Sequence, residues 1–173
     1  MLKPSLPLLV LVLLLGPAAA FAAGGGGGSS TSSTGSGSSS SSRPAVDPVV
    51  SAARAAIAKE DWSGAQADLL QALATHPDRA DYHNLYAYSV RKGPNPDMDL
   101  VFRHYEEALR LNPRHVGAHE YIGEAYLQVN NLPKAREHLA ALDKICIFSC
   151  EEYRDLKKAV AAYEASHKSA AMR

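Results

Sequence analysis

The sequence lacks several features by which protein classes are usually recognised. It holds two cysteines and one tryptophan in 173 residues, and 18 basic and 18 acidic side chains give a formal net charge of zero. A neutral chain has no general electrostatic attraction for nucleic acid or anionic lipid. No G-x-x-x-x-G-K-[ST], G-x-S-x-G or H-E-x-x-H motif is present. The sequence therefore gives no support for the three kinds of catalytic site that these motifs mark. We therefore expect neither catalytic residues nor a cofactor.

Long apolar runs are confined to the first 23 residues. Lys3 precedes the apolar stretch from Leu6 to Leu15, and the small residues of 18–23 offer cleavage sites, which is the layout of a secretory signal peptide. The alternative is an uncleaved anchor, but a spanning helix needs about 20 apolar residues and Gly16-Pro17 ends this run early. We expect residues 1–23 to be a signal peptide. The protein is then exported, to the periplasm if the source is a Gram-negative bacterium and otherwise into the medium, without stable membrane insertion after cleavage.

Composition divides the remaining chain. Residues 24–45 are dominated by glycine and serine and are expected to be a disordered linker, because they offer almost nothing apolar to bury. From residue 46 onward the chain is rich in Ala, Leu, Glu, Arg and Lys, and no run alternates Val, Ile and Thr as a strand would. This pattern predicts one all-helical domain. Residues 169–173 are expected to be a short tail.

A self-match recurs along this domain at a spacing of about 34 residues. The segment "GAQADLLQALATHPD" (64–78) aligns with "MDLVFRHYEEALRLNPR" (98–114), and "YIGEAYLQVNNLPKAREHLAAL" (121–142) is a third copy. The chain thereby resembles the tetratricopeptide repeat, a helix–turn–helix unit, although no repeat has the family's usual tryptophan at its fourth position. The resemblance implies an all-α, right-handed superhelical array. Its parts are three repeats, 46–79, 80–115 and 116–149, and a C-terminal capping helix, 150–168.

The register of the repeats makes local predictions. Small residues, namely Ala53, Ala87 and Gly123, should let the two helices of one repeat approach closely. Helix starts are expected at Asp47-Pro48, at Ser63 with Gln66, at Asn95-Pro96 and at Ser149 with Glu152, because these pairs fit N-cap and capping-box patterns.

In this family the first helix of each repeat lines a concave groove, which suggests a site for a protein or peptide partner. The groove positions are Arg54, Asp81, Asn84, Tyr88, Arg91, Lys92, Glu120, Tyr121, Glu124 and Gln128. Two tyrosines among charges of both signs suit an extended peptide of mixed charge. The alternative is that Tyr88 and Tyr121 pack against neighbouring helices. Family members that clamp a C-terminal carboxylate use Lys and Asn in the groove, and this chain has Asn84 without the rest of that clamp.

The only cysteines, Cys146 and Cys150, lie four residues apart where the third repeat meets the capping helix. In an exported protein they are most simply a disulfide, which requires the preceding helix to end near Cys146. Packed thiols, a redox pair and a metal clip are the alternatives. His115 and His119 could share one helix face and hold a metal with Glu120, whereas packing roles are the competing interpretation.

Two functions are therefore open at this point. The first is a non-enzymatic interaction module, a scaffold, adaptor or assembly factor, that binds a partner in the groove within the cell envelope. The second is a thiol-redox or metal-handling accessory protein that uses Cys146 and Cys150, with His115 and His119 as further candidates.

Overall fold

The structure, a computed structural model, describes residues 47–171, with side chains up to Lys168. The predicted signal peptide and linker, and the end of the predicted tail, lie outside the described residues. The described part is helical throughout, as predicted. Its helices are α1 (Pro48–Ala58), α2 (Trp62–Thr75), α3 (Ala80–Lys92), α4 (Met98–Leu111), α5 (Val116–Gln128), α6 (Leu132–Ile145) and α7 (Glu151–Ala171). None of them is both long and apolar enough to cross a membrane.

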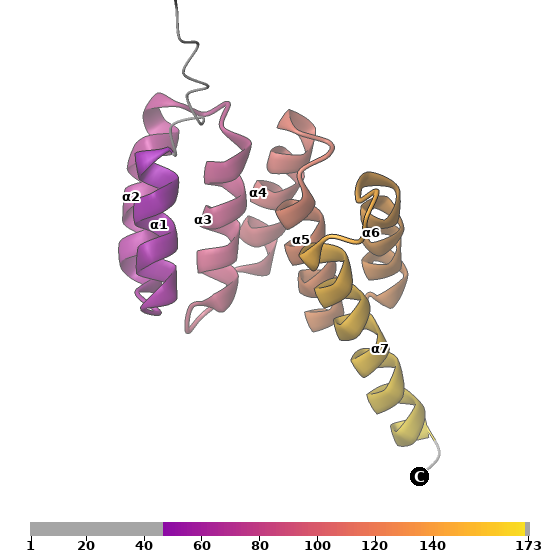
Figure 1. Cartoon of the computed structure of the whole chain (residues 1–173). Coiled ribbons are helices and arrows are strands. Elements are labelled where there is room, and N and C mark those ends of the chain that lie inside the picture. Colours follow the sequence, from indigo (N-terminus) through magenta and orange to yellow (C-terminus); the bar gives the residue numbers. More distant parts are fainter. Residues whose placement is uncertain (1–46, 172–173) are drawn as a thin grey trace, which may run out of the picture. The chain divides into compact units, whose positions relative to one another are not determined.

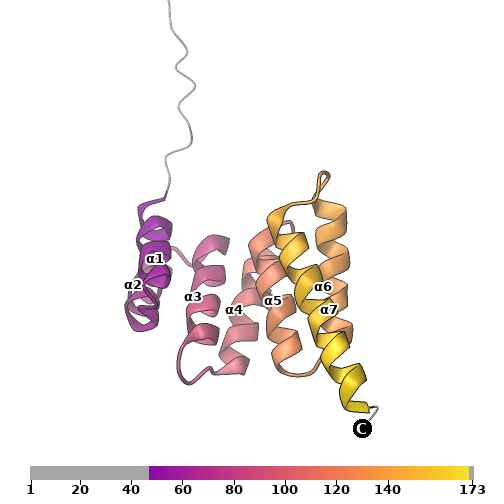
Figure 2. The ribbon, with the colours of Figure 1, turned by 60° about the horizontal axis from the view of Figure 1, so that its bottom comes forward.

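The helices stack in pairs, as Figure 1 shows. α1 packs on α2, α3 on α4 and α5 on α6, and each of the three pairs is one predicted repeat. The first helices of the repeats also contact one another, α1 with α3 and α3 with α5, and α7 then packs on both α5 and α6. Figure 2 shows α7 lying along this last pair. The predicted superhelical array of three repeats and a capping helix is thus confirmed.

The second helix of every repeat begins with the same kind of cap. The side-chain oxygens of Asp61, Asp97 and Asn131 accept hydrogen bonds from the backbone N–H three residues later, at 2.9, 3.0 and 3.3 Å respectively. Each bond satisfies one backbone N–H that the first helical turn leaves without a partner. α1 begins as predicted, with Asp47 as N-cap and Pro48 at N1.

Three predicted helix starts are wrong by one or two residues. Ser63 lies inside α2, where its hydroxyl donates to Asp61, the residue that caps the helix. α4 begins after Asp97 rather than at Asn95-Pro96. α7 begins at Glu151, one residue later than the predicted capping box allows, because Ser149 has a left-handed backbone with φ of 53°. For α2 and α4, two cap-forming residues stand close together in the sequence, Asp61 with Ser63 and Asn95 with Asp97, and the turn geometry selects the aspartate.

Apolar side chains form two adjoining cores. Leu69, Tyr105 and Ile122, which are at most 1% exposed, anchor the core of the first two repeats and α5. Leu142 and Leu156, both fully buried, anchor the core between α6 and α7. In a repeat array each repeat is covered by the next one. The capping helix therefore takes the place of a further repeat and covers the apolar face of the third repeat.

Gly123 lies at the closest helix crossing, but that crossing is not inside a repeat as predicted. A Cβ atom added to Gly123 would lie 2.6 Å from Leu156 Cδ2 and 2.8 Å from Leu156 Cδ1. Carbon atoms at van der Waals contact lie about 3.5–4.0 Å apart. The absence of a side chain at residue 123 thus allows α7 to pack closely against α5. The prediction that Gly123 packs against α6, the other helix of its repeat, is therefore wrong.

A histidine pair occupies the same place in the second and third repeats. His83 Nε2 lies 2.9 Å from the Pro77 carbonyl, and its Nδ1 lies 2.9 Å from Nδ1 of His104. The carbonyl only accepts, so Nε2 of His83 donates and, in the neutral ring, Nδ1 holds a lone pair. Nδ1–H of His104 must then be the donor in this bond.

The third repeat reproduces this geometry. His119 Nε2 lies 3.0 Å from the Pro113 carbonyl, and its Nδ1 lies 3.0 Å from Nδ1 of His138. Burial, followed by the neighbouring histidine, lowers the pKa of His104 and of His138 to about 4. These pairs stand where the family usually has tryptophan, and they tie each first helix to its second helix and to the preceding turn.

The close crossing predicts that Gly123→Leu destabilises the domain. Forcing a side chain into this contact displaces Leu156 and should lower the free energy of unfolding by about 1–3 kcal/mol. Urea unfolding followed by circular dichroism measures the change. Gly123→Leu combined with Leu156→Ala should recover part of the loss, because the second substitution makes room. An unchanged midpoint for the single variant would refute the crossing.

The histidine pairs predict a loss of stability in mild acid. Because the folded-state pKa values of His104 and His138 lie near 4 and the usual value is 6.5, the unfolded chain binds more protons between these two pH values. The stability contributed by neutral histidines is therefore complete above about pH 6.5 and falls as the pH drops through this window. Urea unfolding along a pH series should show a steeper loss in the natural protein than in a His104→Gln, His138→Gln double variant. Equal slopes would show that the pairs do not titrate as the geometry requires.

Candidate functional site

A pocket of about 460 Å³ opens on the layer formed by the first helices of the repeats, and we call it the concave pocket. Its walls come from α1, α3, α5 and the first turn of α7. The lining residues are Arg54, Ile57, Ala58, Asp81, Asn84, Leu85, Tyr88, His115, Val116, Gly117, Tyr121 and Glu152. The pocket thus exists only because four helices distant in sequence stand side by side.

Aromatic side chains line one wall of the concave pocket. The rings of Tyr88 and Tyr121 are tilted against each other with centroids 4.5 Å apart, and Trp62 lies 6.3 Å from Tyr88. Tyr88 and Tyr121 are half-buried, so each packs against helices with one part of its ring and lines the pocket with another. Packing against neighbouring helices is thus confirmed for part of each ring, and contact with a partner stays a prediction.

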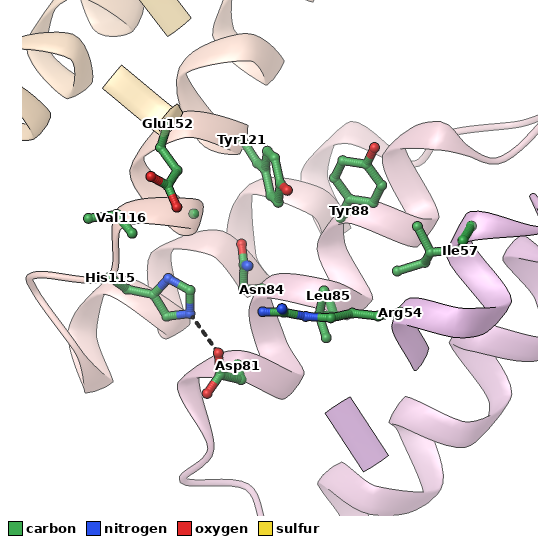
Figure 3. Close-up of a pocket in the computed structure, with 12 residues that line it drawn as sticks. Arg54, Ile57, Asp81, Asn84, Leu85, Tyr88, His115, Val116, Tyr121 and Glu152 are labelled. Atoms are coloured by element: carbon green, nitrogen blue, oxygen red, sulfur yellow. Dashed lines mark ion pairs between the residues drawn. The ribbon is translucent and has the colours of Figure 1, made fainter. Parts of the chain in front are cut away.

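The opposite wall is held by an interaction between Asp81 and His115. Nδ1 of His115 accepts the backbone N–H of Ala118 at 3.1 Å and so caps α5. Nε2 of the same ring lies 3.3 Å from Asp81 Oδ1, as the dashed line in Figure 3 shows. Hydrogen bonding to His115 holds the pKa of Asp81 below its usual value despite partial burial. This pair stabilises the joint between the second and third repeats.

Asn84 stands between these walls without a partner. Its side chain points into the concave pocket between His115 and Tyr121 (Figure 3). Only 4% of the residue is exposed, and its Oδ1 is buried with no hydrogen bond. A buried amide oxygen without a donor costs about 1–3 kcal/mol. Among the described residues, Oδ1 of Asn84 and Nε2 of His115 are the two buried side-chain atoms without a hydrogen-bond partner, and both belong to the pocket.

Arg91 is not the accessible groove residue that the repeat register suggested. It is 5% exposed, and its Nη2 donates to Glu124 Oε2 at 2.7 Å while its Nε donates to the Tyr105 hydroxyl at 3.4 Å. Its guanidinium carbon also lies 5.4 Å from the centroid of the Tyr88 ring. Arg91 and Glu124 thus tie α3 to α5, and their ion pair is structural rather than free for a partner.

The other predicted groove residues divide into two groups. Arg54, Asp81, Asn84, Tyr88 and Tyr121 line the concave pocket. Lys92 and Gln128 are exposed but lie outside its lining. Glu120 is only 8% exposed and also lies outside the lining.

The electrostatics around Glu120 are unusual. Burial, followed by the carboxylates of Glu124, Asp155 and Glu152, raises the pKa of Glu120 to about 8. Glu120 is therefore mostly protonated at neutral pH. Glu124 and Glu120 also act on the pKa values of Tyr88 and Tyr121, which places these acids next to the tyrosine wall.

Two polar pocket residues were not among the predicted groove positions. His115 was considered as a metal ligand, and Glu152 was assigned to a capping box. Both lie at the start of a helix that lines the pocket. Treating α7 as the first helix of one further repeat could have placed Glu152 in the groove.

The metal hypothesis for His115 and His119 is not supported by their contacts. His115 caps α5 and contacts Asp81, whereas His119 contacts His138 and the Pro113 carbonyl. Among the residues that the structure describes, no group of three or more His, Cys, Asp or Glu side chains could hold a metal ion.

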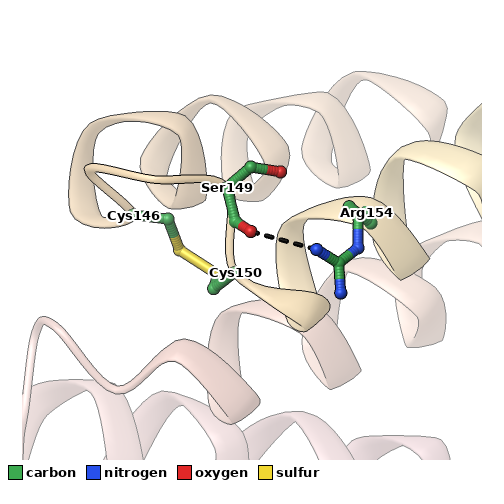
Figure 4. The surroundings of a disulfide bond; sticks show 4 residues. All are labelled: Cys146, Ser149, Cys150 and Arg154. Carbon is green, nitrogen blue, oxygen red and sulfur yellow. Dashed lines mark hydrogen bonds between the residues drawn. A yellow bond between two sulfur atoms is a disulfide. The ribbon is translucent and has the colours of Figure 1, made fainter.

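The two cysteines are joined between α6 and α7, as Figure 4 shows. Their sulfur atoms are 2.05 Å apart, which is bonding distance, and their Cα atoms are 5.5 Å apart. Cys146 is the C-cap of α6, so that helix ends where a disulfide requires. Nη1 of Arg154 donates to the Ser149 carbonyl at 3.2 Å and further fixes the loop. The disulfide thus connects the third repeat to the capping helix.

Comparison with known proteins agrees with this architecture. The family model for the tetratricopeptide repeat matches residues 50–97 and 103–149, which together make up more than half of the chain. The chain therefore belongs to the tetratricopeptide repeat family. None of the curated protein sequences compared with the chain matches it.

A similar solved structure is that of the type III secretion translocator chaperone SycD from Yersinia enterocolitica. The likeness has a TM-score of 0.60 at 11% sequence identity, and covers 69% of this chain and 83% of the chaperone chain. At this identity the likeness shows a shared fold.

The disulfide predicts a local effect of reduction. A cross-link that closes so short a loop contributes about 2 kcal/mol through chain entropy. Reduction should therefore increase amide hydrogen exchange in α7 more than in α1 to α4, because α7 is terminal and depends on packing against a single repeat. Exchange measured by mass spectrometry with and without reductant tests this. Two titratable thiols in protein purified without reductant would contradict the disulfide.

Proposed function

We propose that this protein is a non-enzymatic interaction module, a scaffold, adaptor or assembly factor, that binds an extended segment of a protein partner in the concave pocket. Membership of the tetratricopeptide repeat family supports this proposal, because stacked helix pairs create extended concave binding surfaces. The fold shared with a translocator chaperone is consistent with it. The N-terminal sequence, with its signal-peptide layout, favours a partner in the cell envelope, in the periplasm of a Gram-negative bacterium or outside the cell otherwise.

The observation that carries the proposal is the amide of Asn84. An extended peptide presents N–H and C=O groups in alternation, and one side-chain amide offers both complements. Because Asn84 is nearly buried and has no partner within the described residues, a peptide backbone in the pocket could satisfy it at little entropic cost. Tyr88 and Tyr121 offer rigid contact area beside it. These features suit backbone recognition combined with apolar packing.

The test is a comparison of two leucine variants of the full chain. Affinity capture from a cell-envelope extract of the source organism, followed by mass spectrometry, supplies the partner, and binding is then measured with the purified partner. Asn84→Leu keeps the side-chain volume but removes the amide, and should weaken binding about tenfold or more, as expected when hydrogen bonds to buried groups are lost. The melting temperature should not fall, because no intramolecular hydrogen bond is removed.

Asn95→Leu is the matched control, since Asn95 is exposed in the α3–α4 turn outside the pocket. It should bind the partner as the natural protein does. Equal binding by the Asn84→Leu variant and the natural protein would place the interaction elsewhere on the molecule.

A further inference from the structure

Acidic side chains lie along the contact between α5 and α7, and most of them have no basic side chain as an ion-pair partner. Glu120 and Glu124 lie one turn apart on α5, and Glu152 and Asp155 belong to the first turns of α7. The contact between Gly123 and Leu156 brings these two helices together between the acids. We call these four residues the acidic seam. Of the four, Glu124 has Arg91 as a direct ion-pair partner, and no such pair forms at the other three.

Two further features show that the acidic seam faces a ligand site rather than plain solvent. The Glu152 side chain lines the concave pocket, and it enters from the side opposite Arg54 (Figure 3). Between them stands Asn84, 4% exposed, whose buried Oδ1 accepts no hydrogen bond. Glu120, on the neighbouring turn of α5, is 8% exposed. The carboxylate of Glu152 and the amide oxygen of Asn84 are therefore the acceptors available at this end of the pocket.

The rest of the pocket determines what kind of donor fits. Tyr88 and Tyr121 present aromatic rings beside the acidic seam, and aromatic faces attract ammonium and guanidinium groups. Arg54 lies at the other end, near enough to Asp81 to lower the pKa of that carboxyl. A positive ligand group is consequently expected at the α7 end and not beside Arg54. A metal ion does not fit, because the described residues hold no group of three suitable ligands.

We propose that the α7 end of the concave pocket binds a basic side chain of the partner, with Glu152 as its counter-charge, Asn84 as a hydrogen-bond acceptor and the two tyrosines as its aromatic wall. This inference rests on the proposed function and adds the chemical class of the residue that is recognised. A guanidinium fits this set best, because its planar fork of donors can serve several acceptors at once.

Binding of a cation is coupled to the ionisation of Glu120. The charged groups that influence its pKa are Glu124 on α5, Glu152 and Asp155 on α7, and Arg91 on α3, and Glu120 in turn raises the pKa values of Tyr88 and Tyr121. Since the pKa of Glu120 is raised to about 8, a cation that docks at neutral pH promotes loss of its proton to the buffer. Affinity for a cation should therefore rise between about pH 6.5 and pH 8.5 and then level off, because above this range the carboxylate is already formed.

The experiment is a nuclear magnetic resonance titration of the ¹⁵N-labelled full chain with two small probes. N-acetyl-arginine amide carries the guanidinium, and N-acetyl-citrulline amide has almost the same shape without the charge. The arginine probe should shift the backbone signals of Tyr121 and Glu152 in a saturable way, and the citrulline probe should not. Equal shifts by both probes would overturn the proposal, as would equal shifts produced by Ca²⁺ at matched ionic strength.

Variants test the individual roles. Glu152→Gln should weaken binding of the arginine probe about two- to fivefold, the range expected for partly exposed ion pairs. Glu151→Gln and Asp155→Asn are the matched controls, because both residues are exposed acids on α7 outside the pocket lining, and neither should change the binding. Glu120→Gln should abolish the rise in affinity with pH. An equal loss in the control variants would reduce the effect to general surface charge and refute the site.

The outcome is separable from that of the proposed function. If partner binding depends on Asn84 but the two probes behave alike, the interaction module stands and the basic-residue site falls. If the arginine probe binds at the acidic seam but Asn84→Leu leaves partner binding unchanged, the cation site stands and the proposed peptide site falls.

Discussion

The close contact of α7 with α5 is the constraint on which the described domain depends. It is possible because residue 123 is glycine, since any Cβ at this position would lie 2.6 Å from Leu156. The contact buries Leu156 completely and closes the apolar face of the last repeat. It also brings Glu152 to the rim of the concave pocket and buries Glu120 between two acidic helices. The contact between α5 and α7 therefore both closes the end of the array and brings acidic side chains to its pocket.

The polar side chains inside the repeats are mostly satisfied by one another. Each histidine pair exchanges one N–H···N hydrogen bond and reaches one proline carbonyl, so positions usually filled by an apolar indole are filled by hydrogen-bonded rings instead. Arg91 reaches the Tyr105 hydroxyl and Glu124 across two helices. A buried polar group that is fully paired contributes to a unique arrangement of its neighbours. These pairs connect neighbouring helices of the array to one another.

The sequence was sufficient to predict the repeats but not to predict which residues line the pocket. The recurrence of Ala72 and Pro77 as Ala108 and Pro113 in the second repeat follows from packing that the repeats share, so it can be recognised in the sequence alone. Helix starts were less predictable, because Asp61 and Ser63 both fit an N-cap and the turn geometry decides between them. Arg91 occupies a groove position in the register, yet its long side chain turns back into the core. Such outcomes depend on neighbours from other helices, which no single repeat contains.

The distribution of unsatisfied groups distinguishes support from recognition. Asp81 and His115 lie 3.3 Å apart and stabilise the joint between two repeats, although Nε2 of His115 makes no hydrogen bond. Asn84 lies within the same few helices, is 4% exposed, and its buried Oδ1 makes no hydrogen bond. Leaving this oxygen unpaired lowers the stability of the free protein, whereas an apolar residue of similar size would avoid that cost. Such unfavourable groups persist most readily where they serve binding. Because Oδ1 of Asn84 is an acceptor that faces the pocket, the cost of leaving it unpaired is recovered only by a partner that brings a hydrogen-bond donor.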